Sequence, residues 1–181
     1  LPDYEPAREF LLTLFLETLR ELGRIEGRDY VLCERSGIFI GGDGEAAAKA
    51  AVDAKPDLIF AFNLGHVIAA HKLTKTIPIV MWVSGLPVEV GVAMSYARPG
   101  KNVTGLSSFG GSQFFGKLVQ FLHDVKPGIK RIGAICTYVP PFHPPEEAEP
   151  IIQEIRDAGR VLGIDVRILE VAKPAEQLAN A

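Results

Sequence analysis

The feature that most limits the fold of this chain is an uninterrupted apolar run, Ile77–Val83. A run this short does not make a helix of its own, but it suits a strand buried on both faces of a parallel sheet. Ser84 and Gly85 end the run. Pro87 then suits the first position of a helix, because its φ is already helical and its missing N–H is not needed there. Glu89 follows within the first turn, where a carboxylate favours the helix N-terminus.

The residues after this turn predict a helix and a second strand. Val88, Val92 and Tyr96 are spaced four apart, Pro99 ends the pattern, and a new strand begins near Asn102. In open parallel sheets, ligands bind beyond the carboxyl ends of strands, close to helix N-termini whose N–H groups have no partner in the helix. The sequence therefore predicts a ligand-binding turn, formed by Ser84, Gly85, Leu86 and Pro87.

The remaining chain alternates short apolar strands with amphipathic helices. This alternation predicts an α/β protein with Rossmann-like parallel sheets and right-handed crossovers. GGDG at 41–44 matches neither glycine-rich phosphate-binding pattern, so we interpret it as a turn into a helix. We expect strands over residues 28–40, 55–62, 131–136 and 164–170, and helices over residues 5–22, 44–54, 66–73, 112–126 and 151–162. The helix after Gly111 is expected to turn inward Phe114, Phe115, Leu118, Leu122 and Val125.

Two further turns lie at predicted strand ends, one at Asn63–His66 and one from Thr137 onward. The turns at 63–66 and 84–87 both open helices, so both offer N–H groups and a positive dipole end to a carboxylate. Such sites suit an amino acid or another small carboxylate that is bound without chemical turnover. The alternative for the first turn is that Asn63 or Leu64 only caps the helix while His66 faces solvent.

Composition and motifs exclude several functions. A net charge of −3 does not indicate the basic surface that binds nucleic acid or an anionic membrane. No apolar run approaches the roughly 18 residues of a membrane span. The sequence holds no G-x-S-x-G, C-x-x-C or H-E-x-x-H pattern, and His66 and His71 are poorly spaced for a metal. We therefore expect no enzyme activity, no metal and no cofactor. Cys33 and Cys136 are interpreted as small buried strand residues rather than a disulfide.

Four segments together resemble a known family: LRELGRIEGRDYVL (19–32), DLIFAFNLGHVIAAHKLT (57–74), IPIVMWVSGLPVEVGVAMSYARPGKNVTGLS (77–107) and VKPGIKRIGAIC (125–136). They are similar to ABC-transporter substrate-binding proteins of the group that includes tryptophan- and tyrosine-binding lipoproteins, with ARPGKNVTG as the most specific part. The resemblance implies a type I periplasmic-binding fold with a small ligand in the cleft between two lobes. It also implies a permease partner, a periplasmic or extracytoplasmic location, and cleft positions for Asn63, Gly65 and His66.

The resemblance further implies a domain boundary. Residues 1–110 correspond to a first lobe that lacks its first strand, and residues 111–181 correspond to the start of the second lobe, because in type I binding proteins the helix before RIGAIC already belongs to it. The family places a signal segment, a lipid-attachment cysteine and a first strand ahead of this sequence. We therefore expect a truncated chain, with membrane contact only through a lipid anchor or a permease outside it.

Two departures from the family pattern bear on the ligand. Leu86 stands where family members commonly carry Asp, and it can neither cap a helix nor hold a ligand ammonium. This favours a less polar ligand, such as an aromatic acid without an amine. At the third turn, Thr137–Pro140 replaces Asn-Pro, and Tyr138 and Phe142 either stack on an aromatic ring in the cleft or pack beneath the proline-rich loop. Trp82 is interpreted as a core residue.

These observations predict the extracytoplasmic solute-binding component of an ABC transporter, with an amino acid or an aromatic or carboxylic acid as ligand. The alternative is a ligand-sensing module of a signalling protein, which the missing Asp favours. A Rossmann-like nucleotide-sugar enzyme would need a GxGxxG-like turn or an acid pair, and neither is in the sequence.

Overall fold

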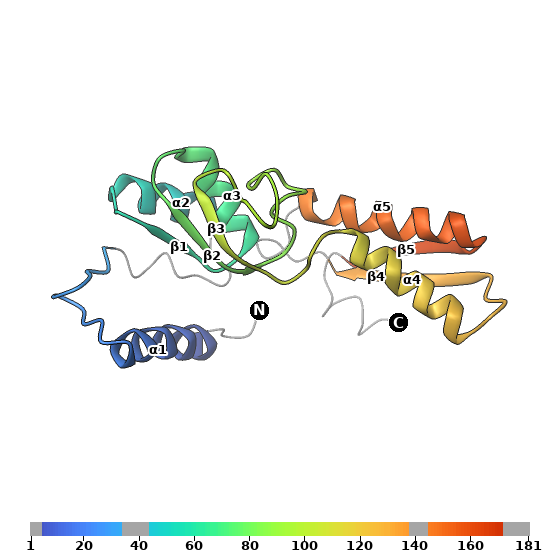
Figure 1. The fold of residues 1–181 in the computed structure, drawn as a ribbon, viewed down its shortest axis with the longest axis horizontal. Coiled ribbons are helices and arrows are strands. Elements are labelled where there is room, and N and C mark those ends of the chain that lie inside the picture. Colours follow the sequence, from blue (N-terminus) through green and yellow to red (C-terminus); the bar gives the residue numbers. More distant parts are fainter. Residues whose placement is uncertain (1–4, 34–43, 138–144, 172–181) are drawn as a thin grey trace.

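The apolar run forms the central strand of a three-stranded parallel sheet, and a second parallel sheet has two strands. The strands are β1 (Ile59–Ala61), β2 (Ile79–Ser84), β3 (Val103–Ser107), β4 (Arg131–Thr137) and β5 (Asp165–Val171). The structure is a computed structural model that describes residues 5–33, 44–137 and 145–171 (Figure 1). Val80 of β2 lies opposite Phe60 of β1 on one side and Thr104 of β3 on the other. The predicted α/β class with parallel sheets is confirmed.

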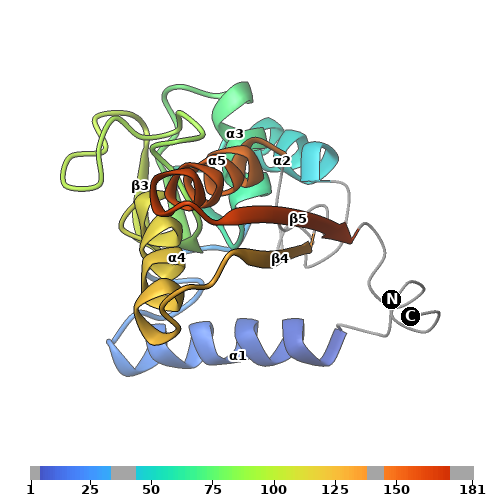
Figure 2. The ribbon, with the colours of Figure 1, turned by 90° about the vertical axis from the view of Figure 1, so that its right-hand side faces the viewer.

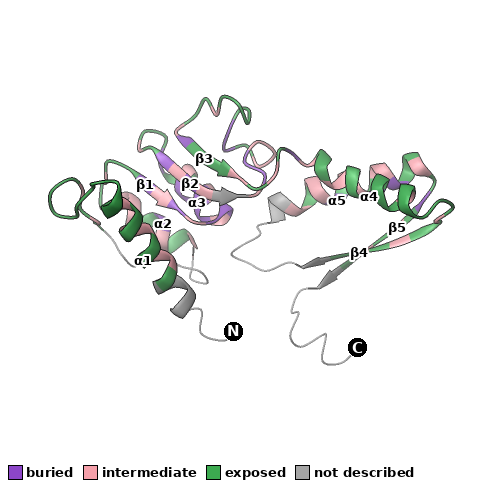
Figure 3. Ribbon diagram, turned by 60° about the horizontal axis from the view of Figure 1, so that its bottom comes forward, coloured by how far each residue is buried: buried purple, intermediate pink, exposed green. Residues whose placement is uncertain are grey.

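Two helices cover one face of the first sheet. α2 (Gly44–Asp53) and α3 (Leu64–Leu73) pack on each other, and α3 also packs on β1 and β2. We call these two helices together with β1–β3 the first unit, and Figure 3 shows that most of the buried residues that the structure describes lie there. Successive strand residues alternate between the two faces, so the helix side receives every second apolar side chain. This core contains Ala48, Ile59, Ala61, Leu64, Val67, Ala69, Ala70, Ile79, Met81, Val92 and Val103.

The opposite face of the first sheet carries an aromatic cluster. Phe60 stacks on Phe15 of α1 (Glu5–Glu21), with 4.8 Å between the ring centroids. Phe62 stacks on Trp82 at 5.3 Å, and Phe60 meets Trp82 edge-on at 6.0 Å. Such pairs add stability beyond the area that they bury. Trp82 therefore packs within the protein as predicted, although it is half-buried and the run is not covered equally on both faces.

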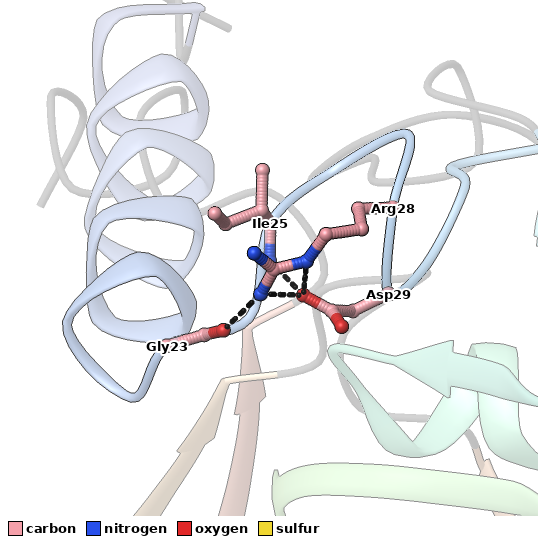
Figure 4. Close-up of polar contacts among 4 residues, drawn as sticks. All are labelled: Gly23, Ile25, Arg28 and Asp29. Atoms are coloured by element: carbon pink, nitrogen blue, oxygen red, sulfur yellow. Dashed lines mark hydrogen bonds and ion pairs between the residues drawn. The ribbon is translucent and has the colours of Figure 1, made fainter.

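A hydrogen-bonded turn follows α1 (Figure 4). The guanidinium of Arg28 donates to the Gly23 carbonyl at 3.0 Å and to Oδ2 of Asp29 at 2.8 Å. The same carboxylate oxygen accepts the Ile25 N–H at 2.8 Å. Gly23 has a φ of 75°, the left-handed conformation that commonly ends a helix. The bonds from Arg28 and Ile25 lower the pKa of the Asp29 carboxyl.

This turn makes the strand predicted at 28–40 wrong over the part that the structure describes. Residues 28–33 contain turns and one end of an isolated bridge between Glu26 and Tyr30. The side chains of Arg28 and Asp29 bond to the backbone of Gly23 and Ile25, so the chain folds back here instead of extending. Cys33 is a free and exposed cysteine rather than a buried strand residue. Residues 34–43 lie outside the described residues, as does the side chain of Cys136.

The helix predicted after Pro87 is also wrong, because the chain makes only a short set of turns there. The N–H groups of Val92 and Ala93 both donate to the Pro87 carbonyl at 3.0 Å. Gly91 has a φ of 75°, which stops a helix after its first turn. The β-branched valines on both sides of Gly91 also have lower helix propensity than straight-chain residues. Bends and irregular backbone therefore lead from Gly91 to the start of β3.

We call the second sheet and the two helices that lie on one of its faces the second unit (Figure 2). α4 (Gln113–Val125) and α5 (Pro145–Leu162) pack on each other, and α5 packs on β5. Gly163 has a φ of 66° and ends α5 as predicted. However, α5 begins at Pro145 rather than near Ile151, with Pro150 inside the helix. The proline-rich composition of this segment therefore misplaced the helix start.

The inward face predicted for α4 is largely wrong. α4 approaches α5 at Gly116, where an added Cβ would lie 3.5 Å from the Glu154 carbonyl oxygen and 3.6 Å from the Cβ of Ala158. Val119 is the buried residue of this helix, and Phe115 is half-buried. Because the side of α4 that carries Gly116 faces α5, most of the larger apolar side chains of α4 point away from α5. Four of the five predicted residues are exposed: Phe114, Leu118, Leu122 and Val125.

The uneven burial of the two sheets gives a stability prediction. Ile79 in β2 is 0% exposed and Ile135 in β4 is 71% exposed. We expect Ile79→Ala to lower the free energy of unfolding by about 2–5 kcal/mol, because it removes buried methylenes and leaves a cavity. The matched variant Ile135→Ala should cost about 1 kcal/mol or less. Urea unfolding of both variants measures the difference, and equal losses would contradict the placement of the core.

Candidate functional site

The turn after β1 is built by the side chain of Asn63, which caps α3. Its Oδ1 accepts the His66 N–H at 2.9 Å, and the Asn63 backbone is extended, as an N-cap requires. Its Nδ2 lies 2.9 Å from Nδ1 of the His66 ring. Asn63 is 9% exposed and His66 is 6% exposed. The capping role weighed for Asn63 is therefore correct, whereas the solvent-facing position weighed for His66 is wrong.

These contacts fix the proton on the His66 ring. The Asn63 oxygen is already used by a backbone N–H, so the amide nitrogen faces Nδ1 and donates to it. Nδ1 is therefore the acceptor, and the neutral ring carries its proton on Nε2. Nε2 is buried without a hydrogen-bond partner among the described residues, close to Gly44 at the start of α2. Burial lowers the pKa of His66, which keeps the ring neutral.

The turn after β2 is held by a neighbouring strand. The Ser107 hydroxyl at the end of β3 donates to the Gly85 carbonyl at 2.6 Å. Leu86 is fully buried and Pro87 is buried, so the Leu86 side chain belongs to the core and only its backbone is available to a ligand. Because Leu86 fills a core position, an apolar residue suits this place where the family pattern commonly has Asp.

Two of the three predicted turns lie at one edge of a sheet. β1 and β2 are parallel neighbours, so residues 63–66 and 84–87 both follow carboxyl ends at the same edge. Thr137 ends β4 in the other sheet, its side chain is not described, and Tyr138 lies outside the described residues together with Phe142. Sequence reasoning missed Ser107, although its position at the end of a third parallel strand was the signal for it.

The segment most specific to the resemblance acts at the opposite edge. The Asn102 amide donates to the carbonyl oxygens of Thr74 at 3.1 Å and Ile77 at 2.9 Å. Its Oδ1 lies 2.7 Å from Nδ1 of His71. Asn102 therefore ties the start of β3 to the end of α3 and the entry to β2. This is a structural role at the amino ends of the strands, away from the predicted ligand turns.

One cavity of the protein lies mostly away from these turns and reaches the first of them at His66. It has a volume of about 580 Å³ and lies between α1, residues 29–33, α2 and β1, with a mostly apolar lining that includes Phe15, Ala48 and His66. A smaller cavity of about 310 Å³ adjoins the second turn and is lined by Pro87, Tyr96 and Ser107 among others. A protein ligand site needs convergent polar groups as well as volume. The turns supply those groups, and His66 touches both the first turn and the larger cavity.

Within residues 5–33, 44–137 and 145–171, no three His, Cys, Asp or Glu side chains gather as a metal site. No helix in this part of the chain has both the length and the apolar character that crossing a bilayer requires.

Comparison with known proteins identifies relatives of this chain. Residues 15–176 match the family model described as ABC transporter substrate binding protein. A tyrosine-binding protein from Clostridioides difficile (strain R20291) is 35% identical over 91 residues, which is 50% of this chain and 26% of that protein. The matched region thus spans about a quarter of the curated relative.

Solved structures share the fold. A conserved domain protein from Vibrio cholerae has a TM-score of 0.65 at 25% identity, covering 96% of this chain and 56% of that one. An ABC domain in complex with L-Trp from Streptococcus pneumoniae has a TM-score of 0.62 at 20% identity, covering 94% of this chain and 55% of that one. The chain therefore spans just over half the length of these structures, and its fold is that of type I periplasmic-binding proteins, as predicted.

The buried His66 ring gives a pH prediction. Because its folded pKa lies below the ordinary value of 6.5, the unfolded chain binds more protons at mildly acidic pH. The contribution of the neutral His66 ring to the free energy of unfolding is complete above pH 6.5. It is lost as the pH falls through 6.5 toward the lowered pKa of the folded state. We expect the free energy of unfolding, measured by urea titration, to fall across this window in the wild type and less steeply in His66→Gln. Gln120→Ala, at an exposed and non-titrating position of α4, is the control and should keep the wild-type slope. A slope unchanged in His66→Gln would contradict the buried, neutral ring.

Proposed function

The chain belongs to the ABC transporter substrate-binding protein family, and on that premise we propose that it is the solute-binding component of an ABC transporter. This is a family of binding proteins rather than enzymes, as the sequence predicted. We propose an extracytoplasmic location and a permease partner, which the family assignment supports. The proposed ligand is a small organic molecule, either an amino acid or an aromatic or carboxylic acid.

The observation that carries this proposal is that two turns follow the carboxyl ends of neighbouring parallel strands, at one edge of the first sheet. The first N–H groups of α3, at Leu64 and Gly65, have no partner within the helix and lie at its positive dipole end. The turn of Ser84–Pro87 lies on the neighbouring strand. We propose that a ligand carboxylate binds between these turns, through backbone N–H groups and the edge of the Asn63–His66 pair.

The chemistry of the turns favours recognition of an acid over recognition of an amine. Neither turn carries an acidic side chain, and Leu86 is buried in the core. A ligand ammonium therefore finds no carboxylate on these two turns. The names of two relatives, one a tyrosine-binding protein and one a complex with L-Trp, support an aromatic side chain on the ligand. An aromatic acid, with or without an amine, meets both conditions.

The second unit completes the proposed cleft. We propose that residues 1–110 form the first lobe and residues 111–181 belong to the second, with closure around a ligand as the transport signal. The described sheets support this division, because β1–β3 form one sheet while β4 and β5 form another. Thr137, which ends β4, and Tyr138, which follows it in the sequence, are the proposed contribution of the second lobe.

A thermal-shift screen tests the proposed function. A ligand that binds only the folded state raises the melting temperature, by about 5–10 °C at a hundredfold excess over Kd for a chain of this size. We expect stabilisation by L-tyrosine, L-tryptophan or the matching aromatic acids without an amine. Nucleotide sugars serve as the control and should give no shift. Stabilisation by nucleotide sugars alone would contradict the proposal.

The cap of α3 allows binding and stability to be separated at Asn63. Asn63→Ala removes the cap and should cost about 1 kcal/mol, whereas Asn63→Ser keeps a capping oxygen and should cost less. We expect Asn63→Ser to weaken ligand binding roughly fivefold to tenfold, because it no longer orients the His66 ring. Calorimetry with the stabilising ligand measures this. Asn102→Ser, at the opposite edge, is the control and should leave the affinity unchanged. Equal affinities in the wild type, Asn63→Ser and Asn102→Ser would show that Asn63 does not contribute to ligand binding.

A further inference from the structure

The two units are joined by a hydrogen bond from a helix N-terminus to a side chain in the first unit. The Ser112 N–H, at the N-cap position of α4, donates to Oε1 of Glu89 at 2.9 Å. The Ser112 side chain makes no capping bond of its own. Glu89 therefore takes the place of a cap residue for α4, and its charge faces the positive end of the helix dipole.

Glu89 itself is held firmly. The Tyr96 hydroxyl donates to Oε2 of Glu89 at 2.7 Å, so both carboxylate oxygens are used. Burial and the adjacent carboxylate raise the pKa of Tyr96, which keeps this hydroxyl protonated as a donor. The backbone around Glu89 is closed by bonds from Val90 to the Leu86 carbonyl and from Gly91 to the Val88 carbonyl. Glu89 thus moves together with the predicted ligand turn that ends at Pro87.

The chain between the units contains two adjacent glycines, Gly110 and Gly111. Gly111 has a φ of 134°, a conformation that L side chains rarely adopt, and a Cβ on Gly110 would meet nothing within 4 Å. A cavity of about 310 Å³ lies beside this segment. Phe109 stacks on Phe114 at 5.7 Å and touches Phe115 at 5.0 Å. These apolar contacts keep the units near each other, but they are less directional than a charge-assisted hydrogen bond.

We propose that Glu89 is the positioning residue that sets the orientation of the second unit relative to the ligand turn, by capping α4 from the first unit. Rotation about Gly110 and Gly111 changes the distance between Ser112 and Glu89, so the bond exists at one orientation. A ligand that shifts the turn at Ser84–Pro87 shifts Glu89 with it, and the cap transmits that shift to the second unit. This link to a ligand rests on the proposed function.

Nuclear magnetic resonance of the whole protein tests the inference without any ligand. We expect the Ser112 amide of the wild type to exchange more slowly with solvent than the amides of Gly111 and Gln113. In Glu89→Ala that exchange should accelerate roughly tenfold to a hundredfold, because a bond to a charged acceptor is lost. Residual dipolar couplings of the two units should fit one alignment in the wild type and separate alignments in Glu89→Ala.

Two further variants separate positioning from stability. Glu89→Gln keeps an oxygen that accepts the Ser112 N–H, so it should preserve the common alignment, and Glu17→Ala on the exposed side of α1 is the matched control that should change nothing. A single common alignment in Glu89→Ala, or an unprotected Ser112 amide in the wild type, would overturn the inference. The wild-type measurement stands even if Glu89→Ala does not fold. Failure of every solute to bind would contradict the proposed function and leave this result intact.

Discussion

The pairing of β2 on both of its edges is the constraint on which the first unit depends. A strand with neighbours on both sides uses its backbone groups in the sheet, so its side chains must supply the burial. Ile79 and Met81 do this on the helix side, while Trp82 joins the aromatic cluster on the other. Because the three strands are parallel, their carboxyl ends come to one edge. That edge is where the two predicted ligand turns meet.

Polar side chains at both edges of this sheet form hydrogen bonds that fix the adjoining loops and helix ends, and we call this set of bonds the frame. At the amino edge Asn102 holds two carbonyl groups, and at the carboxyl edge Asn63 caps α3 and Ser107 holds the second turn. Glu89 extends the frame into the second unit. Each of these side chains supplies a hydrogen-bond partner to a backbone group that would otherwise lack one at or near a strand or helix end. The candidate site is therefore bordered by groups whose own positions are fixed.

The sequence predicted what depends on local pattern and missed what depends on distant partners. The five strands and the helices α1 to α5 were predicted from local sequence pattern except at their ends, while the strand predicted at 28–40 was wrong over the described residues. The helix expected after Pro87 failed because Gly91 stops it, and the inward face of α4 failed because a glycine contact with α5 turns the helix. The bond between Glu89 and Ser112 joins residues far apart in the chain, so it could not be predicted from the local sequence pattern. At the first turn the capping role of Asn63 was among the expectations, whereas the burial of His66 was not.

The most direct test of ligand binding at the carboxyl edge is a map of backbone amide shifts during titration with L-tyrosine. If the ligand lies between the two turns, the largest changes should occur in residues 63–66 and 85–86, where N–H groups border the proposed carboxylate site. Amides along α1 and residues 29–33 should change little. Changes centred instead on the cavity beside α1, around Phe15 and Cys33, would contradict the proposed site.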